Sequence, residues 1–301
     1  MAKVFIGMPA YNGERFISEA IESLLNQSFS DFTLFISDDA STDGTQAICE
    51  MYAKKDPRII YYQQEKNIGM FPNFKFVLDK ANGEYFMWAS HDDIREKDYL
   101  KVCVENIENK KVDATTTVTS VVDSYGRSTR ELTELTKLSG KPSMQQVAKY
   151  ILQPEILGKC NLMYSVFKTS VIKKLWEIYP QKMEWGSDYH FSLAIISHFK
   201  VYVDKRILFK KRLGGHSSKD STKKDNPNTV KRAVIQNPKN HIFPFGKFRQ
   251  YFNGHMRALE GTPYRPLAAL LLLARLPRSF FIHLKGRSIK RFTKGSPRDQ
   301  F

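Results

Sequence analysis

Two pairs of adjacent acidic residues follow short apolar runs in the first hundred residues of this 301-residue chain, Asp38 with Asp39 and Asp92 with Asp93. Two carboxylates side by side at the end of a buried strand repel each other and need a compensating positive charge. Carboxylate oxygens suit Mg²⁺ or Mn²⁺, which proteins often bind through one or two carboxylates and a substrate phosphate. The pairs therefore predict a divalent cation site, with solvated loop acids or helix N-caps as the alternative.

Several common cofactor and nucleophile motifs are missing from the sequence. No glycine-rich dinucleotide fingerprint follows a predicted strand, and neither a P-loop nor a nucleophile elbow occurs. Cys49, Cys103 and Cys160 are widely spaced and form no zinc-ligand pattern, so we expect free thiols. The chemistry must therefore come mainly from carboxylates.

The acidic pairs lie in a segment that alternates between strand-like and helix-like patterns. Apolar residues recur at helical spacing within 14–27, and similar signals predict helices over 45–54 and 71–81. The intervening apolar runs predict strands at 4–8, 33–37, 59–63 and 85–89. This alternation is typical of a parallel sheet with right-handed crossovers, whose ligands bind beyond the carboxyl ends of the strands. Both acidic pairs are expected at that edge.

The pattern becomes looser after about residue 113. A strand is expected over 114–122 and another over 201–208, with helices over 144–152, 169–179 and 186–198. The polar segments 127–143 and 214–228 are expected to be loops.

Six short motifs together carry a family resemblance. They are Met8–Glu14 (MPAYNGE), Leu25–Ser28 (LNQS), Asp38–Gly44 (DDASTDG), Asn67–Gly69 (NIG), Ala81–Tyr85 (ANGEY) and His91–Asp93 (HDD). In this order and spacing the sequence resembles the family 2 glycosyltransferases, from about residue 3 to residue 220. The resemblance implies an α/β fold of the GT-A type, a mixed and mostly parallel sheet flanked by helices, and a hexosyltransferase-type enzyme.

The resemblance also assigns residues to the donor nucleotide. Pro9 and Tyr11 would line the base, with the Tyr11 ring offering a stacking face. Asp39 would accept a hydrogen bond from the N3–H of uracil or thymine, which selects UDP- or dTDP-sugars. Glu14 would accept from a ribose hydroxyl, or else is a solvated acid in the first turn of a helix.

The His91–Asp93 segment resembles the metal motif of the family, with histidine where an acid often stands. Asp93 would be the direct metal ligand, and Asp92 would contact ribose or metal. Further along, the segment 210–218 resembles the family's Arg-x-x-x-His loop. There Arg212 would neutralise the leaving diphosphate, and His216 would approach the metal or the diphosphate, or else be solvated. The implied cofactor is Mg²⁺ or Mn²⁺.

The segment Glu184–Tyr189 resembles the acidic stretch that opens an acceptor-side helix in the family. Asp188 would be the catalytic general base, taking the proton from an acceptor hydroxyl as it attacks the anomeric carbon in one inverting displacement. The alternative for Asp188 is a helix N-cap. Trp185 would stack on a sugar or pack in the core.

These assignments imply an inverting, metal-dependent transfer from a nucleotide-diphosphate sugar to a glycan or lipid-linked acceptor, as in surface polysaccharide synthesis. A nucleotidyltransferase is one rival, although such enzymes usually have a glycine-rich loop where this chain has Met8–Asn12. A non-catalytic nucleotide-sugar-binding protein is the other. We expect a catalytic domain over 1–235, with a nucleotide-binding half to about 112 and an acceptor half over 113–235.

The net charge of +16 is concentrated near the C-terminus, since residues 205–301 hold 23 basic and 4 acidic residues. We expect residues 236–301 to be a basic, amphipathic, helical extension that binds an anionic membrane surface or packs on the body. No recognised nucleic-acid module accompanies these charges, so no nucleic acid is expected. The sequence shows neither a signal peptide nor a membrane-spanning run, which predicts a cytoplasmic protein, peripheral on the inner face of the membrane.

Overall fold

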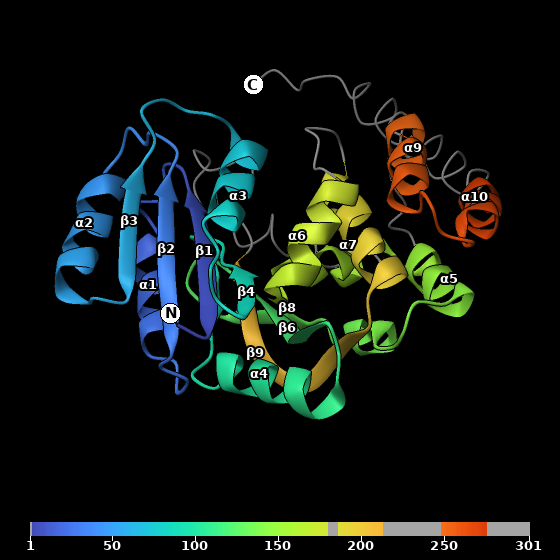
Figure 1. Cartoon of the computed structure of the whole chain (residues 1–301), viewed down its shortest axis with the longest axis horizontal. Coiled ribbons are helices and arrows are strands. Elements are labelled where there is room, and N and C mark those ends of the chain that lie inside the picture. The colour runs from blue at the N-terminus through green and yellow to red at the C-terminus, as the bar shows by residue number, and fades with distance from the viewer. Residues whose placement is uncertain (1, 180–185, 213–247, 276–301) are drawn as a thin grey trace, which may run out of the picture.

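The computed structural model describes residues 2–179, 186–212 and 248–275 of the chain. Within these ranges nine strands form one sheet in the order β3-β2-β1-β4-β8-β6-β9-β5, with β7 paired to β6 (Figure 1). Six strands run in one direction, while β5, β7 and β8 run against them. The strands are β1 (Val4–Ala10), β2 (Phe32–Asp38), β3 (Ile59–Gln63), β4 (Tyr85–Trp88), β5 (Ile94–Arg95), β6 (Ala114–Val122), β7 (Ser128–Glu131), β8 (Val166–Lys168) and β9 (Val201–Arg212).

Helices cover both faces of this sheet (Figure 1). The α-helices are α1 (Ile17–Leu25), α2 (Thr45–Lys55), α3 (Met70–Asp79), α4 (Tyr99–Lys110), α5 (Met144–Leu152), α6 (Thr169–Ile178), α7 (Ser187–His198), α9 (Phe248–Ala258) and α10 (Arg265–Ala274). Short 3₁₀ turns add η1 (Thr133–Leu138), η2 (Glu155–Leu157) and η3 (Lys159–Tyr164). The predicted α/β class and mostly parallel mixed sheet are confirmed.

Alternating side chains of the strands feed two separate cores. In β1, Val4, Ile6 and Met8 pack with α1, α2 and α4, while Phe5 packs on the opposite face with α3. Trp88, at the end of β4, is fully buried in the second core, and its indole N–H donates to the carbonyl of Phe74 at 3.1 Å. Because successive residues of a strand point to opposite faces, each strand holds both helical layers in place.

The expected elements of the first half are present, with ends shifted by a few residues. Three parts of the chain differ more. The helix α4 and the short strands β5 and β8 have no counterpart among the expected elements. The predicted loop over 127–143 is wrong in part, because β7 bonds to β6 there and η1 follows.

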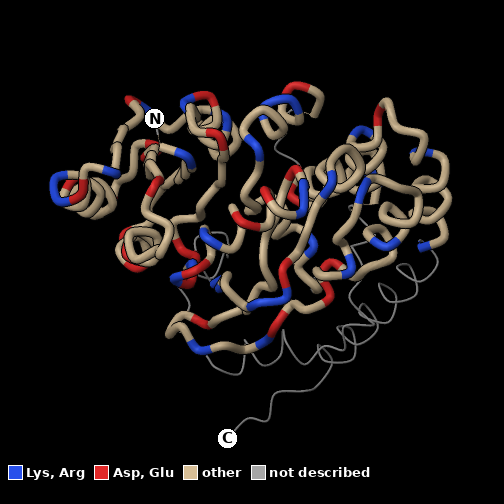
Figure 2. The backbone as a smooth tube through the Cα atoms, turned by 60° about the horizontal axis from the view of Figure 1, so that its bottom comes forward, with Lys and Arg blue, Asp and Glu red and all other residues tan. Residues whose placement is uncertain are grey.

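The helices α9 and α10 lie against α5 and α7 (Figure 1). Tyr251, Leu259 and Leu272 are fully buried in the same core as α5, α6 and α7. For residues 248–275, packing on the body is therefore the alternative that the structure supports. Acidic and basic residues are interspersed along this described body (Figure 2). None of its helices combines the length and the apolar character needed to cross a bilayer.

Candidate active site

The carboxyl ends of three parallel strands meet at one edge of the sheet. Ala10 of β1 is in register with Asp38 of β2, and Gly7 of β1 with Trp88 of β4, so the loops after these strands are neighbours. A cleft of about 370 Å³ opens between these loops and the end of β9. It is lined by Pro9, Ala10, Tyr11, Asp39, Asn67, Met70, Asn73, Phe74, Ser90, His91, Asp92, Asp93, Tyr164, Lys211 and Arg212.

Hydrogen bonds join the loop after β1 to the loop after β2. The amide oxygen of Asn12 accepts from the backbone N–H of Thr42, and the backbone N–H of Asn12 donates to the Ser41 hydroxyl, both at 2.8 Å. Glu14 is exposed and does not line the cleft, and its carboxylate accepts from the backbone N–H of Gly44 at 3.0 Å, just before α2. The contact of Glu14 with a ribose stays a prediction. In the structure Glu14 is an acid at the N-terminus of α2.

Asp38 and Asp39, the first acidic pair, make different contacts. One oxygen of Asp38 accepts from the backbone N–H of Ser41 at 3.0 Å and the other from the Tyr61 hydroxyl at 3.0 Å, so this carboxylate stabilises the loop. Asp39 lines the cleft, and its two oxygens accept from the backbone N–H groups of Ile68 and Gly69 at 2.7 and 2.9 Å. Gly69 has φ +93°, a conformation open mainly to glycine. Asp39 thus fixes the loop that begins α3.

The second acidic pair lies deeper. Asp93 is only 5% exposed, and one of its oxygens accepts from the backbone N–H of Arg212 at 2.9 Å. Burial and the neighbouring carboxylate of Asp92 raise the pKa of Asp93 to about 6, against the opposing charges of Lys211 and Arg95. A buried carboxylate with a raised pKa beside a second acid is an electrostatically unfavourable arrangement that a cation would relieve.

Asp92 and Asp93 therefore fit a divalent cation. Over the described ranges, no three His, Cys, Asp or Glu side chains come together as a metal site. Mg²⁺ and Mn²⁺ accept a site with one or two carboxylates because water and substrate phosphate supply the other ligands. His216 and its predicted metal contact lie outside the described residues.

Arg212 is a structural centre at the end of β9. Its side chain is 1% exposed, and its guanidinium donates to the backbone carbonyls of Asp92, Asp123 and Ser124 at 3.1–3.2 Å. The same group pairs with the carboxylate of Glu19 at 2.5 Å. Its role at the diphosphate stays a prediction, because in the structure the guanidinium joins the Asp92 loop to the turn at Asp123 and Ser124 and to Glu19 of α1.

Lys211 also lines the cleft, although no motif in the sequence assigns it a role. Its ammonium donates to the side-chain oxygen of Asn161 at 3.1 Å and lies 5.3 Å from the centre of the Tyr164 ring. Burial disfavours its charged form, but the negative potentials of surrounding groups, Asp93 and Asp188 among them, raise the pKa of Lys211 above its ordinary value. The neighbouring Lys210 pairs instead with Glu96.

Asp188 lies in the first turn of α7, two residues after its N-cap Gly186, so the N-cap alternative is not what the structure shows. Asp188 is half-buried and outside the lining of the cleft. Burial, together with the negative charge of Asp188, raises the pKa of the Cys160 thiol to about 12. The same carboxylate contributes to raising the pKa of Lys211. Lys211 is therefore the charged group that both Asp93 and Asp188 influence. Trp185 lies outside the described residues.

Comparison with curated proteins gives several relatives of moderate identity. The chain is 26% identical over 214 residues to the uncharacterized glycosyltransferase MJ1057 of Methanocaldococcus jannaschii, covering 70% of each protein. It is 26% identical over 261 residues to the minor teichoic acid biosynthesis protein GgaB of Bacillus subtilis, covering 82% of this chain but 28% of GgaB. The second relative is therefore much longer than the region it shares with this chain.

Two solved structures share the fold. TarS 1–349 of S. aureus in complex with UDP-GlcNAc superposes with a TM-score of 0.62 at 17% identity, covering 95% of this chain and 92% of that one. The mannosyltransferase PcManGT of Pyrobaculum calidifontis, in complex with GDP-Man and Mn²⁺, gives a TM-score of 0.50 at 15% identity, covering 96% and 80%.

The family model for "Glycosyl transferase family 2" matches residues 5–176, which is more than half of the chain. The matched region includes β1 to β4 and every cleft residue that those strands contribute. The chain therefore belongs to glycosyl transferase family 2 and is a glycosyltransferase.

Proposed function

We propose that this enzyme moves a sugar from a UDP- or dTDP-sugar to a hydroxyl of a glycan or lipid-linked acceptor, with inversion and with a divalent cation. One observation carries the proposal. A single cleft is lined by an aromatic ring and an acid suited to a base, Tyr11 and Asp39, and by the buried acid Asp93 and the cation Lys211. A nucleoside diphosphate has groups that match these residues, a base for Tyr11 and Asp39 and phosphates for a cation and Lys211.

At the base end, Tyr11 and Pro9 offer apolar surface and Asp39 offers acceptor oxygens. Each carboxylate oxygen has two lone pairs, so the bonds from Ile68 and Gly69 leave Asp39 able to accept another hydrogen. A pyrimidine with an N3–H, as in UDP or dTDP, would supply it. The UDP-GlcNAc complex of TarS, which has the same fold, supports this donor class.

At the phosphate end, Asp93 and Asp92 would hold the divalent cation, which would supply charge neutralisation for the departing diphosphate. The Mn²⁺ complex of PcManGT supports a metal in this fold. Lys211 adds a fixed positive charge in the same cleft. The charge that grows on a leaving phosphate is stabilised most by groups already oriented before the reaction.

We propose a reaction in which Asp188, the residue that the family resemblance assigns as the base, acts on the acceptor. Asp188 takes the proton of an acceptor hydroxyl, and the oxygen attacks the anomeric carbon from the face opposite the diphosphate. The new glycosidic bond forms as the bond to the diphosphate oxygen breaks, and the electron pair leaves with the nucleoside diphosphate. One displacement inverts the anomeric centre, so no covalent intermediate with the enzyme is required. A surface polysaccharide is the proposed product, a class supported by the similarity to GgaB.

Release of nucleoside diphosphate from a panel of UDP-, dTDP- and GDP-sugars tests the donor class. We expect turnover with a UDP- or dTDP-sugar to exceed turnover with any GDP-sugar by at least tenfold, because guanine is a larger purine whose N1–H lies farther from the ribose than the pyrimidine N3–H. Removal of Mn²⁺ or Mg²⁺ with EDTA should abolish turnover. A preference for GDP-sugars would refute the role of Asp39 at the base.

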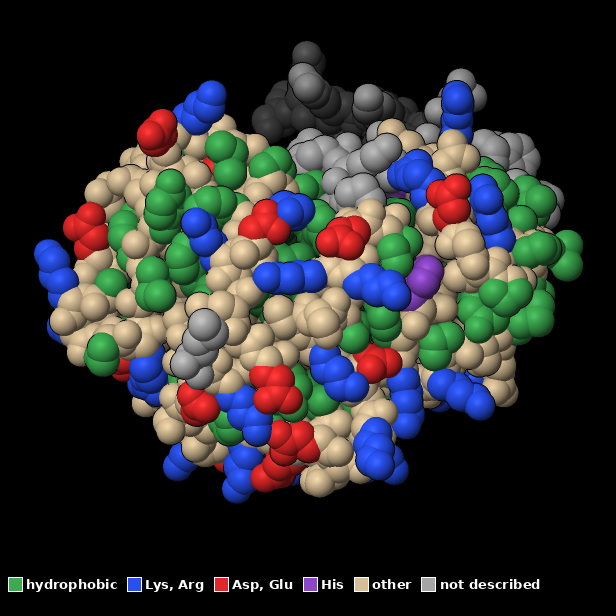
Figure 3. Space-filling model, viewed as in Figure 1, with side chains coloured by type: hydrophobic (Ala, Val, Ile, Leu, Met, Phe, Trp, Pro, Cys, Tyr) green, Lys and Arg blue, Asp and Glu red, His purple; other side chains and the backbone are tan. Residues whose placement is uncertain are grey.

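We further propose that the enzyme binds an anionic membrane through the apolar patch formed by Leu152, Leu270 and Leu273. These side chains are 57%, 64% and 48% exposed on the contacting helices α5 and α10. Figure 3 shows hydrophobic side chains gathered at the right-hand end, over these helices. Lys149 of α5 and Arg265 of α10 are exposed on the same two helices, and the sequence after α10 carries eight basic residues and one acidic residue. Apolar side chains beside clustered cations suit an anionic bilayer surface.

Sedimentation with lipid vesicles tests this patch. We expect the enzyme to bind vesicles with 30% phosphatidylglycerol and not pure phosphatidylcholine vesicles. The double variant Leu270→Glu with Leu273→Glu should bind at least tenfold more weakly, since it removes two apolar anchors and adds negative charge. Met51→Glu with Ile60→Glu, at exposed apolar positions of α2 and β3, is the matched control. Equal loss in both double variants, or no binding by the parent enzyme, would overturn the proposal.

A further inference from the structure

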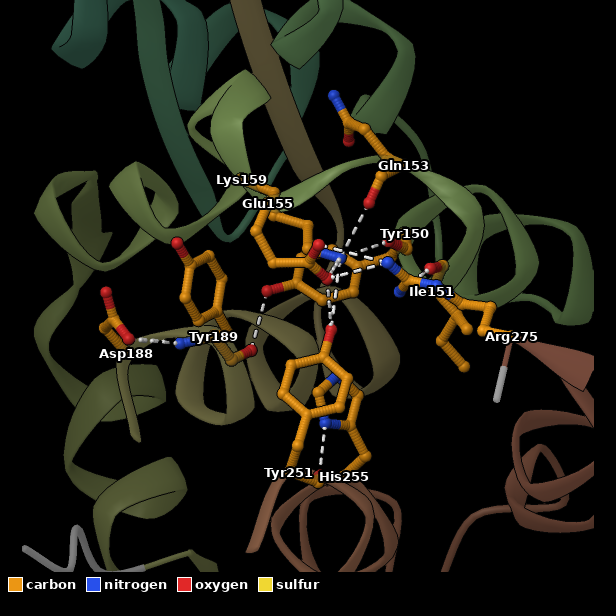
Figure 4. A network of polar contacts seen from close by, with 10 residues as sticks. All are labelled: Tyr150, Ile151, Gln153, Glu155, Lys159, Asp188, Tyr189, Tyr251, His255 and Arg275. Carbon is orange, nitrogen blue, oxygen red and sulfur yellow. Dashed lines mark hydrogen bonds and ion pairs between the residues drawn. The ribbon is translucent and has the colours of Figure 1, made fainter. Parts of the chain in front are cut away.

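A buried cluster of charges lies where α5, α9 and α10 meet (Figure 4). Lys159 has a fully buried side chain, and its ammonium lies 3.2 Å from a carboxylate oxygen of Glu155. Arg275, just after α10, pairs with the other oxygen of Glu155 at 3.0 Å. The cluster therefore joins a residue at the end of the C-terminal helical pair to η2 and η3 in the acceptor half.

The polar atoms of this cluster have partners of good geometry. Lys159 also donates to the backbone carbonyls of Tyr150 and Gln153, both at 2.9 Å. The Tyr251 hydroxyl of α9 donates to Glu155 at 2.6 Å. Although burial alone would raise the pKa of Glu155, Lys159 and Arg275 lower it to about 2. A buried ionic cluster that is fully bonded fixes a specific arrangement of its elements.

The cluster continues to the first turn of α7 through a tyrosine (Figure 4). The ring of Tyr150 is fully buried, with the Lys159 ammonium 4.6 Å from its centre. Its hydroxyl donates to the backbone carbonyl of Tyr189 at 2.6 Å. The backbone N–H of Tyr189 in turn donates to the carboxylate of Asp188 at 3.0 Å. Two hydrogen bonds thus separate Tyr150 from the proposed base.

The helix α9 packs on the same turn from another side. A Cβ at Gly254 would lie 2.0 Å from the ring of His190, so only glycine lets α9 approach α7 this closely. His190 is fully buried, and its ring lies 5.8 Å from that of Tyr251. The first turn of α7 is therefore held by α5 and by α9.

We propose that Tyr150 is a positioning residue for Asp188, and that the Glu155–Lys159–Arg275 cluster supports Tyr150. This inference rests on the proposed role of Asp188 as the general base. It makes α9 and α10 part of the machinery that aims the base at the acceptor hydroxyl. A base acts only within hydrogen-bonding reach of its proton, so a small rotation of this turn lowers the rate.

Tyr150→Phe tests the proposal, because it keeps the ring in the core and removes the hydroxyl alone. We expect kcat to fall about tenfold, while the dissociation constant for UDP and the KM for the acceptor change less than twofold. Assays well below the melting temperature exclude unfolding as the cause. Tyr52→Phe is the matched control, since its hydroxyl also bonds to a side chain, Glu22 at 2.6 Å, but in the nucleotide half.

The outcome for Asp188→Asn separates this inference from the proposed function. If Asp188→Asn is inactive and Tyr150→Phe keeps the kcat of the parent enzyme, the positioning role is refuted and the base remains. If Asp188→Asn is fully active, the base assignment itself fails, and the inference fails with it. A lower melting temperature in Tyr150→Phe without a change in kcat would show a structural role only and would refute positioning.

Discussion

Asp188→Asn is expected to lower kcat by roughly 10² to 10⁴-fold, the usual contribution of a positioned general base. Asparagine has nearly the same shape and its side-chain oxygen can still accept from the N–H of Tyr189, so the first turn of α7 should persist. Since Asp188 does not line the cleft, UDP should bind with less than a twofold change in affinity. Calorimetric titration with UDP and Mn²⁺, beside a turnover assay, measures both quantities.

Asp79→Asn is a suitable control for the Asp188 variant. Asp79 is an exposed acid of α3 that pairs with Lys75, outside the cleft, and its loss should leave kcat and UDP affinity unchanged. A fall in UDP affinity in Asp188→Asn that matches the fall in kcat would contradict a base acting only on the acceptor. The same result would remove support for an inverting displacement with Asp188.

The positions of the first four strands could be predicted because each combines an apolar run with a polar stop. The strand expected over 4–8, for example, is found as β1 over Val4–Ala10, two residues longer, and the polar residues Tyr11 and Asn12 follow outside it. The carboxyl ends of parallel strands lie at the same edge of a sheet. The strand pattern was therefore enough to predict that Tyr11, Asp39 and Asp93 lie in one cleft.

The helix α4 could have been found by the same method. Its apolar residues Leu100, Cys103, Val104 and Ile107 recur at helical spacing and are buried. The strands β5 and β8 could not, because two or three residues are too short for a periodic pattern. Their pairing partners lie far away in the sequence, and tertiary contacts alone define them.

The position of Lys211 in the cleft could not be predicted from the sequence, because it depends on the register of β9. Lys210, Lys211 and Arg212 follow one another in β9 and look equivalent, yet they contact Glu96, Asn161 and Glu19 respectively. Lys211 and Arg212 line the cleft and Lys210 does not, a division that depends on the register of β9 with β6. That register contains shifts between Thr117 and Thr119, which no local pattern predicts.

The sequence also did not decide whether residues 248–275 pack on the body. The basic, amphipathic character of the last third left open whether it binds a membrane surface or packs on the body, and the structure places Tyr251 and Leu272 in the core. The buried charges show why, since Arg275 finds its partner in Glu155, 120 residues earlier. A basic residue that pairs inside the protein cannot be told from a solvated one by composition alone.

Asp93→Asn is expected to have opposite effects on activity and on stability. Loss of the carboxylate should remove the Mn²⁺ dependence of UDP binding and lower turnover by at least 10²-fold, because a bound cation stabilises the leaving group by several kcal/mol. The metal-free variant should nevertheless be more stable than the parent enzyme. Burial and Asp92 raise the pKa of Asp93 from 3.8 to about 6, so ionising Asp93 costs the folded state roughly 3 kcal/mol at pH 8.

The sign of this effect gives it a distinctive pH dependence. Between about pH 4 and pH 6 the folded state holds a proton that the unfolded chain has released, so the stability contributed by Asp93 falls as the pH rises. The gap between Asp93→Asn and the parent enzyme should therefore be near zero below pH 4, open through this window and stay constant above it. Urea unfolding in EDTA at pH 4, 6 and 8 measures the gap. A variant less stable than the parent enzyme at pH 8 would mean that Asp93 is held by compensating charge without a metal, and the proposed cation site would lose its electrostatic basis.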